Sequence, residues 1–405
     1  MTAGRVVVIG AGMAGTAAAF AAARAGAAVV VVHDRAGASA LYSGALDLVA
    51  WDAEVSAAVA TRTQAALADA GLAAFLTALG VHRLGGTAPN GLIATASGVV
   101  RPALGADHAL LELAPLAGRR VAVADVERDD WDAPLLAKTL GASDWAERTG
   151  TTFTPISVRL LRTGYERRIA PYDFAELHDD PARGAALADA LNAAGPDADA
   201  WLVGPWLGVE PDTVAAIRSR ARAPLGETTS PLAGAAGARF ERARDRLFMQ
   251  LGVEVRRGRV GRIAAHGAGW AVELASEVEG TPSELSAAAV VLATGGVGAG
   301  GVVFTWRLPG VVRGFELPFA APVTLALDGE PAAGGGSLYG PSLETKGLGV
   351  LERVGIACDA LGRPVGNHDP QTGLFVAGDA VAGRPRTMLE AALAGLASGN
   401  VAARE

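Results

Sequence analysis

The chain has 405 residues, half of them hydrophobic, so it is long enough for two or three domains with a large core. Its 35 basic and 42 acidic residues give a net charge of −7, which argues against a nucleic-acid or anionic-membrane binder. The single cysteine, Cys358, excludes an intrachain disulfide and an iron–sulfur cluster ligated by this chain's own cysteines.

The first element is an apolar run, Val6 to Ile9, which we expect to form a β-strand. The sequence Gly10-Ala11-Gly12-Met13-Ala14-Gly15 follows, then an Ala-rich helical stretch and a second apolar run, Val29 to Val32. In this strand–turn–helix–strand context, G-x-G-x-x-G indicates dinucleotide binding, with the phosphates at the helix N-terminus. We expect all six residues of the motif to bind a flavin; a glycine-rich turn without a ligand is the alternative.

The end of the second strand departs from the usual pattern. A carboxylate there normally binds the adenosine ribose, but His33 occupies this position and Asp34 follows one place later. Side chains alternate along a strand, so the two residues would not point the same way. Both are candidates for cofactor binding, and the departure weakens the prediction of FAD.

The next two hundred residues suggest an inserted region. We expect a helix over residues 53–80, short strands and loops over 81–120, a strand at Val121–Asp125, helices over 132–141 and 181–194, and a buried strand with a turn over 200–209. Thr151–Arg168 has mixed character and carries a cluster of four arginines, Arg159, Arg162, Arg167 and Arg168. A solvated face, or a face for an acidic partner, explains this cluster better than catalysis does.

The chain then returns to the nucleotide fold. A helix over Ala238–Leu251 ends at Gly252. Short antiparallel strands are expected at Val253–Val255, Val260–Ile263 and Trp270–Leu274. The core strand Val290–Leu292 runs into Ala293-Thr294-Gly295-Gly296, a sequence that commonly lines a flavin nucleotide. The candidates for cofactor binding in this part are Val260, Ala293, Thr294 and Gly295.

A third motif lies near the C-terminus, where a strand ends in Gly378-Asp379. We expect the carboxylate to lie beside the first glycine-rich turn and to accept a hydrogen bond from a ribityl hydroxyl. A closing helix over 387–403 would point its N-terminus at the flavin ring, which adds Met388 and Leu389 to the candidates. A surface turn is the alternative.

Together these pieces predict an α/β protein with a doubly wound, Rossmann-like flavin domain and an inserted cap domain. The predicted flavin domain comprises residues 1–47, 235–300 and 366–405. The cap or substrate region is expected at 48–234, and a second inserted segment at 301–365.

The order of the three motifs resembles that of the two-dinucleotide-fold flavoproteins. Ser43-Gly44-Ala45-Leu46-Asp47-Leu48, Trp201–Pro205 and the Glu227, Pro231, Gly237, Arg239 pattern resemble the second flavoprotein subunit of anaerobic glycerol-3-phosphate dehydrogenase. The resemblance implies a protein that usually carries FMN and works beside a catalytic flavoprotein and an iron–sulfur partner. The complex oxidises glycerol 3-phosphate to dihydroxyacetone phosphate and passes electrons to quinones. The resemblance also adds Ser43 and Gly44 to the cofactor candidates. The single cysteine suits a reducing cytosol, so we expect a cytoplasmic protein, and the resemblance implies that a partner can hold it at the inner membrane.

Several alternatives stay open. Asp379 and the intact glycine motif favour FAD, whereas the resemblance implies FMN. The chain could instead be a self-contained FAD-dependent oxidoreductase of another small anionic metabolite, or a scaffold that has lost its cofactor. Arginine suits the recognition of a phosphate or carboxylate, and the candidates near the flavin are Arg239, Arg307, Arg313, Arg384 and Arg386.

Other functions find no support in the sequence. The six histidines form no ligand pair of the usual spacing, so no metal site is expected. There is no Gly-x-Ser-x-Gly motif of a hydrolase. We expect no signal peptide, because the first apolar run starts at once and no small-residue cleavage site follows it. We expect no direct membrane insertion, because the long apolar stretches are interrupted by glycines.

Overall fold

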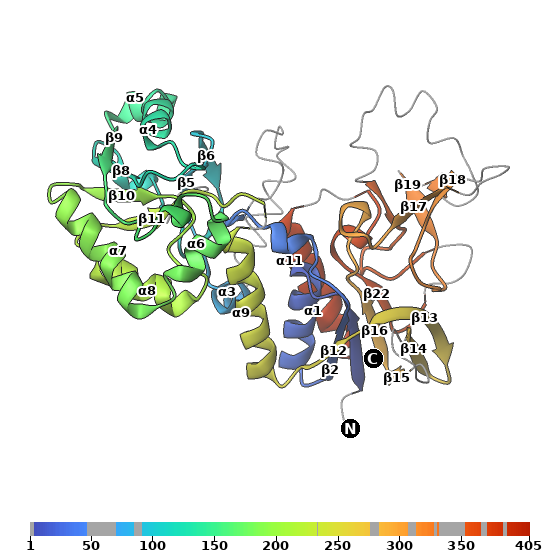
Figure 1. Ribbon diagram of the computed structural model, residues 1–405. Coiled ribbons are helices and arrows are strands. Elements are labelled where there is room, and N and C mark those ends of the chain that lie inside the picture. Colours follow the sequence, from blue (N-terminus) through green and yellow to red (C-terminus); the bar gives the residue numbers. More distant parts are fainter. Residues whose placement is uncertain are drawn as a thin grey trace. The chain divides into compact units, whose positions relative to one another are not determined.

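The computed structural model describes residues 4–46, 70–84, 91–232, 234–275, 283–306, 313–327, 330–331, 353–365, 371–383 and 387–405 (Figure 1). The chain divides into unit 1, residues 1–39, 48–75 and 244–405, and unit 2, residues 40–47 and 76–243. The sequence prediction assigns 235–243 to the flavin domain and 301–365 to a second insertion. In the structure the division falls after Ala243, and the described residues of 301–365 belong to unit 1.

Unit 1 is built on a five-stranded parallel sheet. Its order is β12 (Glu254–Arg257), β2 (Ala28–His33), β1 (Arg5–Ile9), β16 (Ala289–Leu292) and β22 (Leu374–Val376). Numbered along the chain, this is 3-2-1-4-5, the order of a doubly wound dinucleotide-binding sheet. The predicted Rossmann-like α/β class is therefore confirmed. The predicted antiparallel strand at 253–255 is wrong, because β12 follows the crossover helix α9 (Ala235–Leu251) and pairs in parallel with β2.

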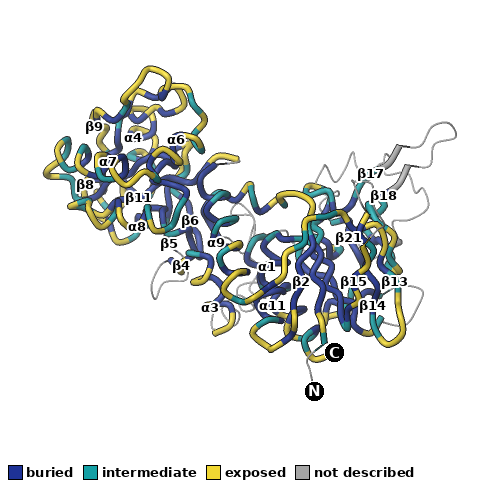
Figure 2. Tube along the Cα trace, turned by 60° about the horizontal axis from the view of Figure 1, so that its bottom comes forward, coloured by how far each residue is buried: buried dark blue, intermediate teal, exposed yellow. Residues whose placement is uncertain are grey.

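Two helices pack on this sheet through small residues. A Cβ on Gly395 of α11 (Met388–Ala402) would lie 2.2 Å from the carbonyl oxygen of Ala14 on α1 (Met13–Arg24). A Cβ on Gly399 would lie equally close, at 2.2 Å, to the oxygen of Ala18. The glycine and alanine content of these helices thus lets their backbones touch, and the strands beneath them are buried (Figure 2).

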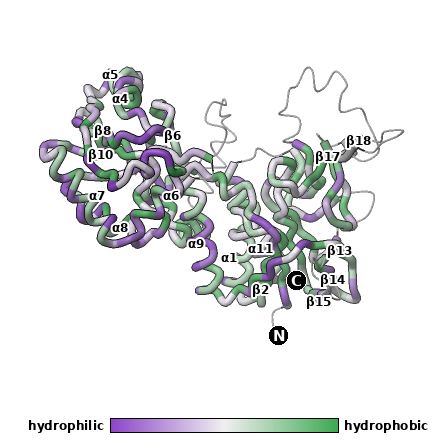
Figure 3. Tube along the Cα trace, in the orientation of Figure 1, coloured by the Kyte–Doolittle hydropathy of each residue, from purple (hydrophilic) through white to green (hydrophobic). Residues whose placement is uncertain are grey.

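The rest of unit 1 consists of antiparallel strands. One sheet contains β13 (Arg259–His266), β14 (Gly269–Ala275) and β15 (Glu284–Ala287); a ribbon contains β17 (Val303–Trp306) and β18 (Arg313–Glu316); a third group contains β20 (Glu330–Pro331), β19 (Leu325–Leu327) and β21 (Val354–Ile356). Trp270, Phe315 and Ile356 from these strands share one buried cluster with Val7 and Val290 of the parallel sheet. Hydrophobic burial against that sheet is therefore what joins them to unit 1 (Figure 3).

Unit 2 contains a second parallel sheet, ordered β9 (Thr152–Ser157), β8 (Arg120–Asp125), β10 (Ala200–Val203) and β11 (Leu225–Glu227). In chain order this is 2-1-3-4, the other common doubly wound order. The helices between these strands are α4 (Ala133–Gly141), α5 (Asp144–Thr149), α6 (Pro171–Leu177), α7 (Pro181–Ala194) and α8 (Pro211–Arg220). The predicted helices at 132–141 and 181–194 are confirmed.

Small elements complete unit 2. They are β3 (Ala45–Leu46), β4 (Val81–Arg83) and β7 (Gly105–Asp107) in one sheet, and β5 (Gly91–Ala94) with β6 (Val100–Ala103) in a hairpin. Helix α3 (Ala70–Ala78) spans the division between the units. It is the described part of the helix predicted over 53–80; residues 53–69 lie outside the described residues.

Candidate cofactor site

The glycine-rich loop joins the carboxyl end of β1 to the first turn of α1. Gly10 has a φ of 107° and donates its N–H to the oxygen of Val32 at 2.8 Å. A Cβ on Gly10 would lie 2.2 Å from the oxygen of Ala293, and one on Gly15 would lie 1.9 Å from the oxygen of Gly10. Both positions therefore require glycine, because backbone occupies the space of a side chain.

The N-terminus of α1 is suited to an anionic group. Its N-cap, Gly12, supplies no side-chain oxygen to the first-turn N–H groups, and the Met13 N–H donates to Oγ of Ser39 at 2.9 Å. Arg244 of α9 lies buried beneath the loop and donates from Nη1 to the oxygen of Ala11 at 3.2 Å. The guanidinium also pairs with Oδ1 of Asp245 at 2.9 Å, so it holds the loop in place. The helix dipole is what favours a negative charge at the loop.

The three glycine motifs meet at this end of the sheet. The Gly10 contact places the loop against Ala293, where β16 ends. A Cβ on Gly378 would lie 2.6 Å from Cβ of Ala14, so the turn that carries Asp379 lies against the first turn of α1. The crevice of a 3-2-1-4-5 sheet lies between strands 1 and 4, here β1 and β16. Residues far apart in the sequence thus share one cradle.

Thr294 shows that this cradle suits a polar ligand. Its Oγ1 is buried and has no hydrogen-bond partner among the described residues. A buried hydroxyl without a partner is costly in a native structure, and a bound ligand would remove that cost. The backbone cradle and the orphan hydroxyl both fit a dinucleotide.

His33 ends β2 and is half-buried, opposite Arg257 on β12. Burial lowers its pKa and the charges of Arg244 and Arg257 lower it further, while a hydrogen bond to the Arg35 oxygen raises it. The imidazole is therefore neutral at neutral pH and retains a nitrogen that can accept a hydroxyl proton. Asp34 is exposed and pairs with Arg35 at 3.3 Å.

The remaining candidates have diverse surroundings. Val260 is buried in β13, two residues after Gly258, whose N–H donates to the oxygen of His33 at 3.0 Å. Met388 and Leu389 open α11, and Leu389 is fully buried. Ser43 and Gly44 belong to unit 2, whereas the glycine-rich loop belongs to unit 1, so their place at the cofactor stays a prediction.

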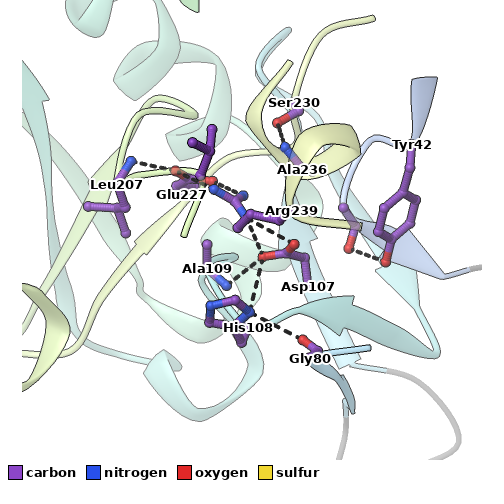
Figure 4. A network of polar contacts seen from close by, with 12 residues as sticks. Tyr42, Gly80, Asp107, His108, Ala109, Leu207, Glu227, Ser230, Ala236 and Arg239 are labelled. Carbon is purple, nitrogen blue, oxygen red and sulfur yellow. Dashed lines mark hydrogen bonds and ion pairs between the residues drawn. The ribbon is translucent and has the colours of Figure 1, made fainter. Parts of the chain in front are cut away.

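Arg239 does not meet the expectation that it contacts substrate. Only 1% of its surface is exposed. Its Nε donates to both carboxylate oxygens of Asp107 at 3.0 Å, and its Nη2 donates to Oε2 of Glu227 at 2.6 Å (Figure 4). Nη1 donates to the oxygen of Gly208 at 2.6 Å. With every nitrogen of its guanidinium engaged inside unit 2, Arg239 is a structural residue.

The other candidate arginines are not placed by the structure. Arg307, Arg384 and Arg386 lie outside the described residues, and of Arg313 only the backbone in β18 is described. Conversely, Arg244 and Ser39 contact the glycine-rich loop although the sequence did not predict them. Neither belongs to a sequence motif, and only the packing of α9 and the loop at 38–41 brings them there.

Two further observations concern metal sites and membrane spans. Within the described ranges, no group of three His, Cys, Asp or Glu side chains could hold a metal ion. In that same part of the chain, no helix has the length and hydropathy needed to cross a membrane.

Comparison with known proteins agrees with the position of the motif. The family model of glucose inhibited division protein A matches residues 5–52, which include β1, α1 and β2. No curated protein matches the sequence. Similar solved structures include AlpK (16% identity, 98% of this chain and 60% of that chain, TM-score 0.33) and the 3-ketosteroid Δ1-dehydrogenase of Sterolibacterium denitrificans (13% identity, all of both chains, TM-score 0.42). Iminodiacetate oxidase of Chelativorans sp. BNC1 is another (16% identity, 99% of this chain and 93% of that chain, TM-score 0.30).

The chain thus spans about three fifths of the length of AlpK. At these identities and TM-scores, the structural likenesses carry no argument about activity or substrate.

Proposed function

We propose that this chain is a flavin-dependent oxidoreductase and that its cofactor is FAD. The observation that carries the proposal is the meeting of the Gly10–Gly15 loop, the Ala293–Gly295 turn and the Gly378–Asp379 turn at the β1/β16 end of a 3-2-1-4-5 sheet. A plain nicotinamide dehydrogenase has no need of the late Gly-Asp turn. The family-model match over residues 5–52 supports nucleotide binding by the same segment.

The residues of the cradle have distinct tasks in this proposal. The first turn of α1, with Arg244 beneath it, holds the pyrophosphate. His33 accepts a hydrogen bond from the adenosine ribose, and Asp379 binds a ribityl hydroxyl. Oγ1 of Thr294 forms its hydrogen bond with the cofactor. When bound, the flavin would supply hydride chemistry, while the protein orients it and excludes water.

For the substrate, we propose a small anionic metabolite. The resemblance of Ser43–Leu48 and of the Glu227–Arg239 pattern to the second flavoprotein subunit of anaerobic glycerol-3-phosphate dehydrogenase favours glycerol 3-phosphate, with this chain relaying electrons to its partners. In this relay version the chain reaches the inner membrane only through a partner. A self-contained oxidoreductase of another anion is the second candidate.

The test begins with the mass of the cofactor released from purified, unreconstituted protein. Release of FAD supports the proposal. Release of FMN favours the version in which the chain relays electrons to partner subunits. Colourless protein that takes up no flavin overturns the proposal. Anaerobic mixing of the flavin-loaded protein with glycerol 3-phosphate then separates the two substrate versions. Rapid bleaching with steady turnover by the isolated chain contradicts the relay role.

A further inference from the structure

A surface loop of unit 2 carries the arginine cluster that the proposed function leaves unused. We call residues 159–168, which follow the carboxyl end of β9, the arginine loop. It contains Arg159, Arg162, Arg167 and Arg168 around a short 3-10 turn, Gly164–Arg167. Tyr165 in this turn is 76% exposed.

The arginine loop is anchored from within by a buried ion pair. Glu166 is 8% exposed in its side chain and receives hydrogen bonds from both terminal nitrogens of Arg183, at 3.1 and 2.5 Å. The same carboxylate accepts the backbone N–H of Arg162 at 3.0 Å. One buried carboxylate thereby fixes both the start and the turn of the loop.

A second buried cation holds the backbone of the loop. The guanidinium of Arg128 is fully buried and donates to the oxygens of Glu166 at 2.6 Å and Ile169 at 2.8 Å. It also lies 4.3 Å from the ring centre of Phe174. Glu127, just before it, has a φ of 46°, the one positive value outside glycine among the described residues. Such strain persists only where surrounding contacts over-determine the backbone.

This anchoring is more than a solvated loop requires. Buried charges are costly to desolvate, and three of them lie under a segment whose outer side chains reach into water. Fixing a loop in advance lowers the entropy cost of binding a partner. Tyrosine and arginine are also among the residues that are enriched in the hot spots of protein interfaces.

The charge on the outer side is not fully compensated. Arg167 and Arg168 share Asp129, at 3.1 and 3.3 Å. Arg159 and Arg162 are exposed, and their guanidiniums have no ion-pair partner among the described residues. A net positive patch therefore stands on a chain whose total charge is −7.

The position of the loop supports a binding role. The unit 2 sheet has the doubly wound order 2-1-3-4, and ligands of such sheets bind beyond the carboxyl ends of the strands. The arginine loop leaves from this edge at β9, and Asp129, which pairs with it, lies in the loop after β8. The carboxyl edge of the second sheet is thus the edge that carries the patch.

From these observations we infer that the arginine loop docks an acidic protein surface, with Arg159 and Arg162 pairing with its carboxylates and Tyr165 packing between them. Two other polyanions fit less well. A nucleic acid needs a basic stripe on a basic domain, and an anionic membrane needs a larger uncompensated cluster. The inference does not depend on the cofactor.

The test measures binding of a fluorescein-labelled poly-glutamate peptide to the whole protein by anisotropy, at low and at physiological salt. The double variant Arg159→Glu/Arg162→Glu should bind roughly tenfold more weakly. The matched control is Arg119→Glu/Arg222→Glu, which makes the same charge change with two exposed residues that lie before β8 and β11, at the opposite edge of the same sheet. This control should bind within a factor of about two of the wild-type chain.

A third variant and two competitors separate docking from general attraction. Tyr165→Ala leaves the charge unchanged and should weaken peptide binding several-fold. Equal losses in the two double variants, or an unchanged affinity of Tyr165→Ala, overturn the inference. So does tighter binding of oligothymidylate, or of phosphatidylserine vesicles, than of the peptide. Effective competition by inorganic phosphate would replace it with a small-anion site.

Discussion

Arg239 and Glu227 form a buried ion pair, with Nη2 2.6 Å from Oε2 and neither side chain more than 1% exposed. Burial raises the pKa of Glu227, and the charge and hydrogen bonds of Arg239 oppose that rise. Asp107 shares the same guanidinium, so the pair connects the first part of α9 with β11 and β7 in unit 2. The sequence predicts that Arg239 binds a substrate anion, but in the structure it binds two carboxylates of its own chain.

The first prediction concerns this network. Arg239→Met should destabilise the protein by about 3–5 kcal/mol, because two carboxylates would stay buried without their cation. Urea unfolding followed by circular dichroism measures the loss. Arg220→Met, which breaks the exposed pair with Asp189, is the control and should unfold close to the wild-type chain. An Arg239→Met protein of normal stability with a raised substrate KM would restore the substrate role.

The second prediction concerns the glycine-rich loop. Gly15→Ala should abolish flavin retention, because its Cβ would lie 1.9 Å from the oxygen of Gly10 and force the loop off the sheet. Gly298→Ala is the matched control in the same unit, since a Cβ there meets nothing within 4 Å. The ratio of flavin absorbance to protein absorbance after gel filtration measures both. Equal flavin content in the two variants would mean that the loop does not form the site.

The sequence predicts the first sheet better than the second for a physical reason. β1, β2 and β16 are continuous apolar runs, because both faces of a central parallel strand are buried. β9 is an edge strand with mostly exposed residues, so Thr152–Ser157 gives no such pattern and the doubly wound sheet of unit 2 could not be predicted. β12 is mostly exposed as well, and its parallel pairing depends on a partner two hundred residues earlier.

The sequence also predicts some residues of the candidate site better than others. Glycines whose missing Cβ permits backbone contact form recognisable motifs, so Gly10, Gly15 and Gly378 could be predicted. Long charged side chains form no such motifs, because the fold determines which partners they contact. Nothing in the sequence distinguishes Arg239, which is internally paired, from Arg244, which lies beneath the nucleotide loop.

The third prediction tests the role of His33. His33→Glu should tighten FAD binding several-fold, because a carboxylate accepts two ribose hydroxyls where a neutral imidazole accepts one. Arg244 and Arg257, which lower the pKa of His33, would favour the charged glutamate. Fluorescence titration of the flavin-free protein measures the affinity. Weaker binding by His33→Glu would show that an adenosine ribose does not lie at this position.

The fourth prediction concerns Asp379. Asp379→Ala should weaken FAD binding by about 1.5–3 kcal/mol, the size of a hydrogen bond to a charged group. Asp379→Asn keeps an acceptor oxygen and should recover part of the loss. The same titration measures both, and affinities equal to that of the wild-type protein would remove Asp379 from the site.

The last prediction follows from a buried histidine in unit 2. His178 is fully buried, with its ring 4.9 Å from that of Phe174. Burial lowers its pKa from 6.5 to about 4, and the charge of Arg183 adds to this effect. The native state therefore holds the imidazole neutral at pH values where the unfolded chain binds a proton. The contribution to stability is complete above pH 6.5 and is lost as the pH falls toward about 4.

Unfolding free energies measured across this window should fall by up to roughly 3 kcal/mol through His178 alone. His178→Gln cannot titrate, so its curve should be flatter than that of the wild-type chain even if its stability at neutral pH is lower. His266→Gln changes an exposed histidine of β13 and serves as the control, which should follow the wild-type curve. If His178→Gln instead runs parallel to the wild-type curve, the acid sensitivity arises elsewhere. The anchor of the arginine loop would then be the next group to examine, because Arg183 also pairs with Glu166.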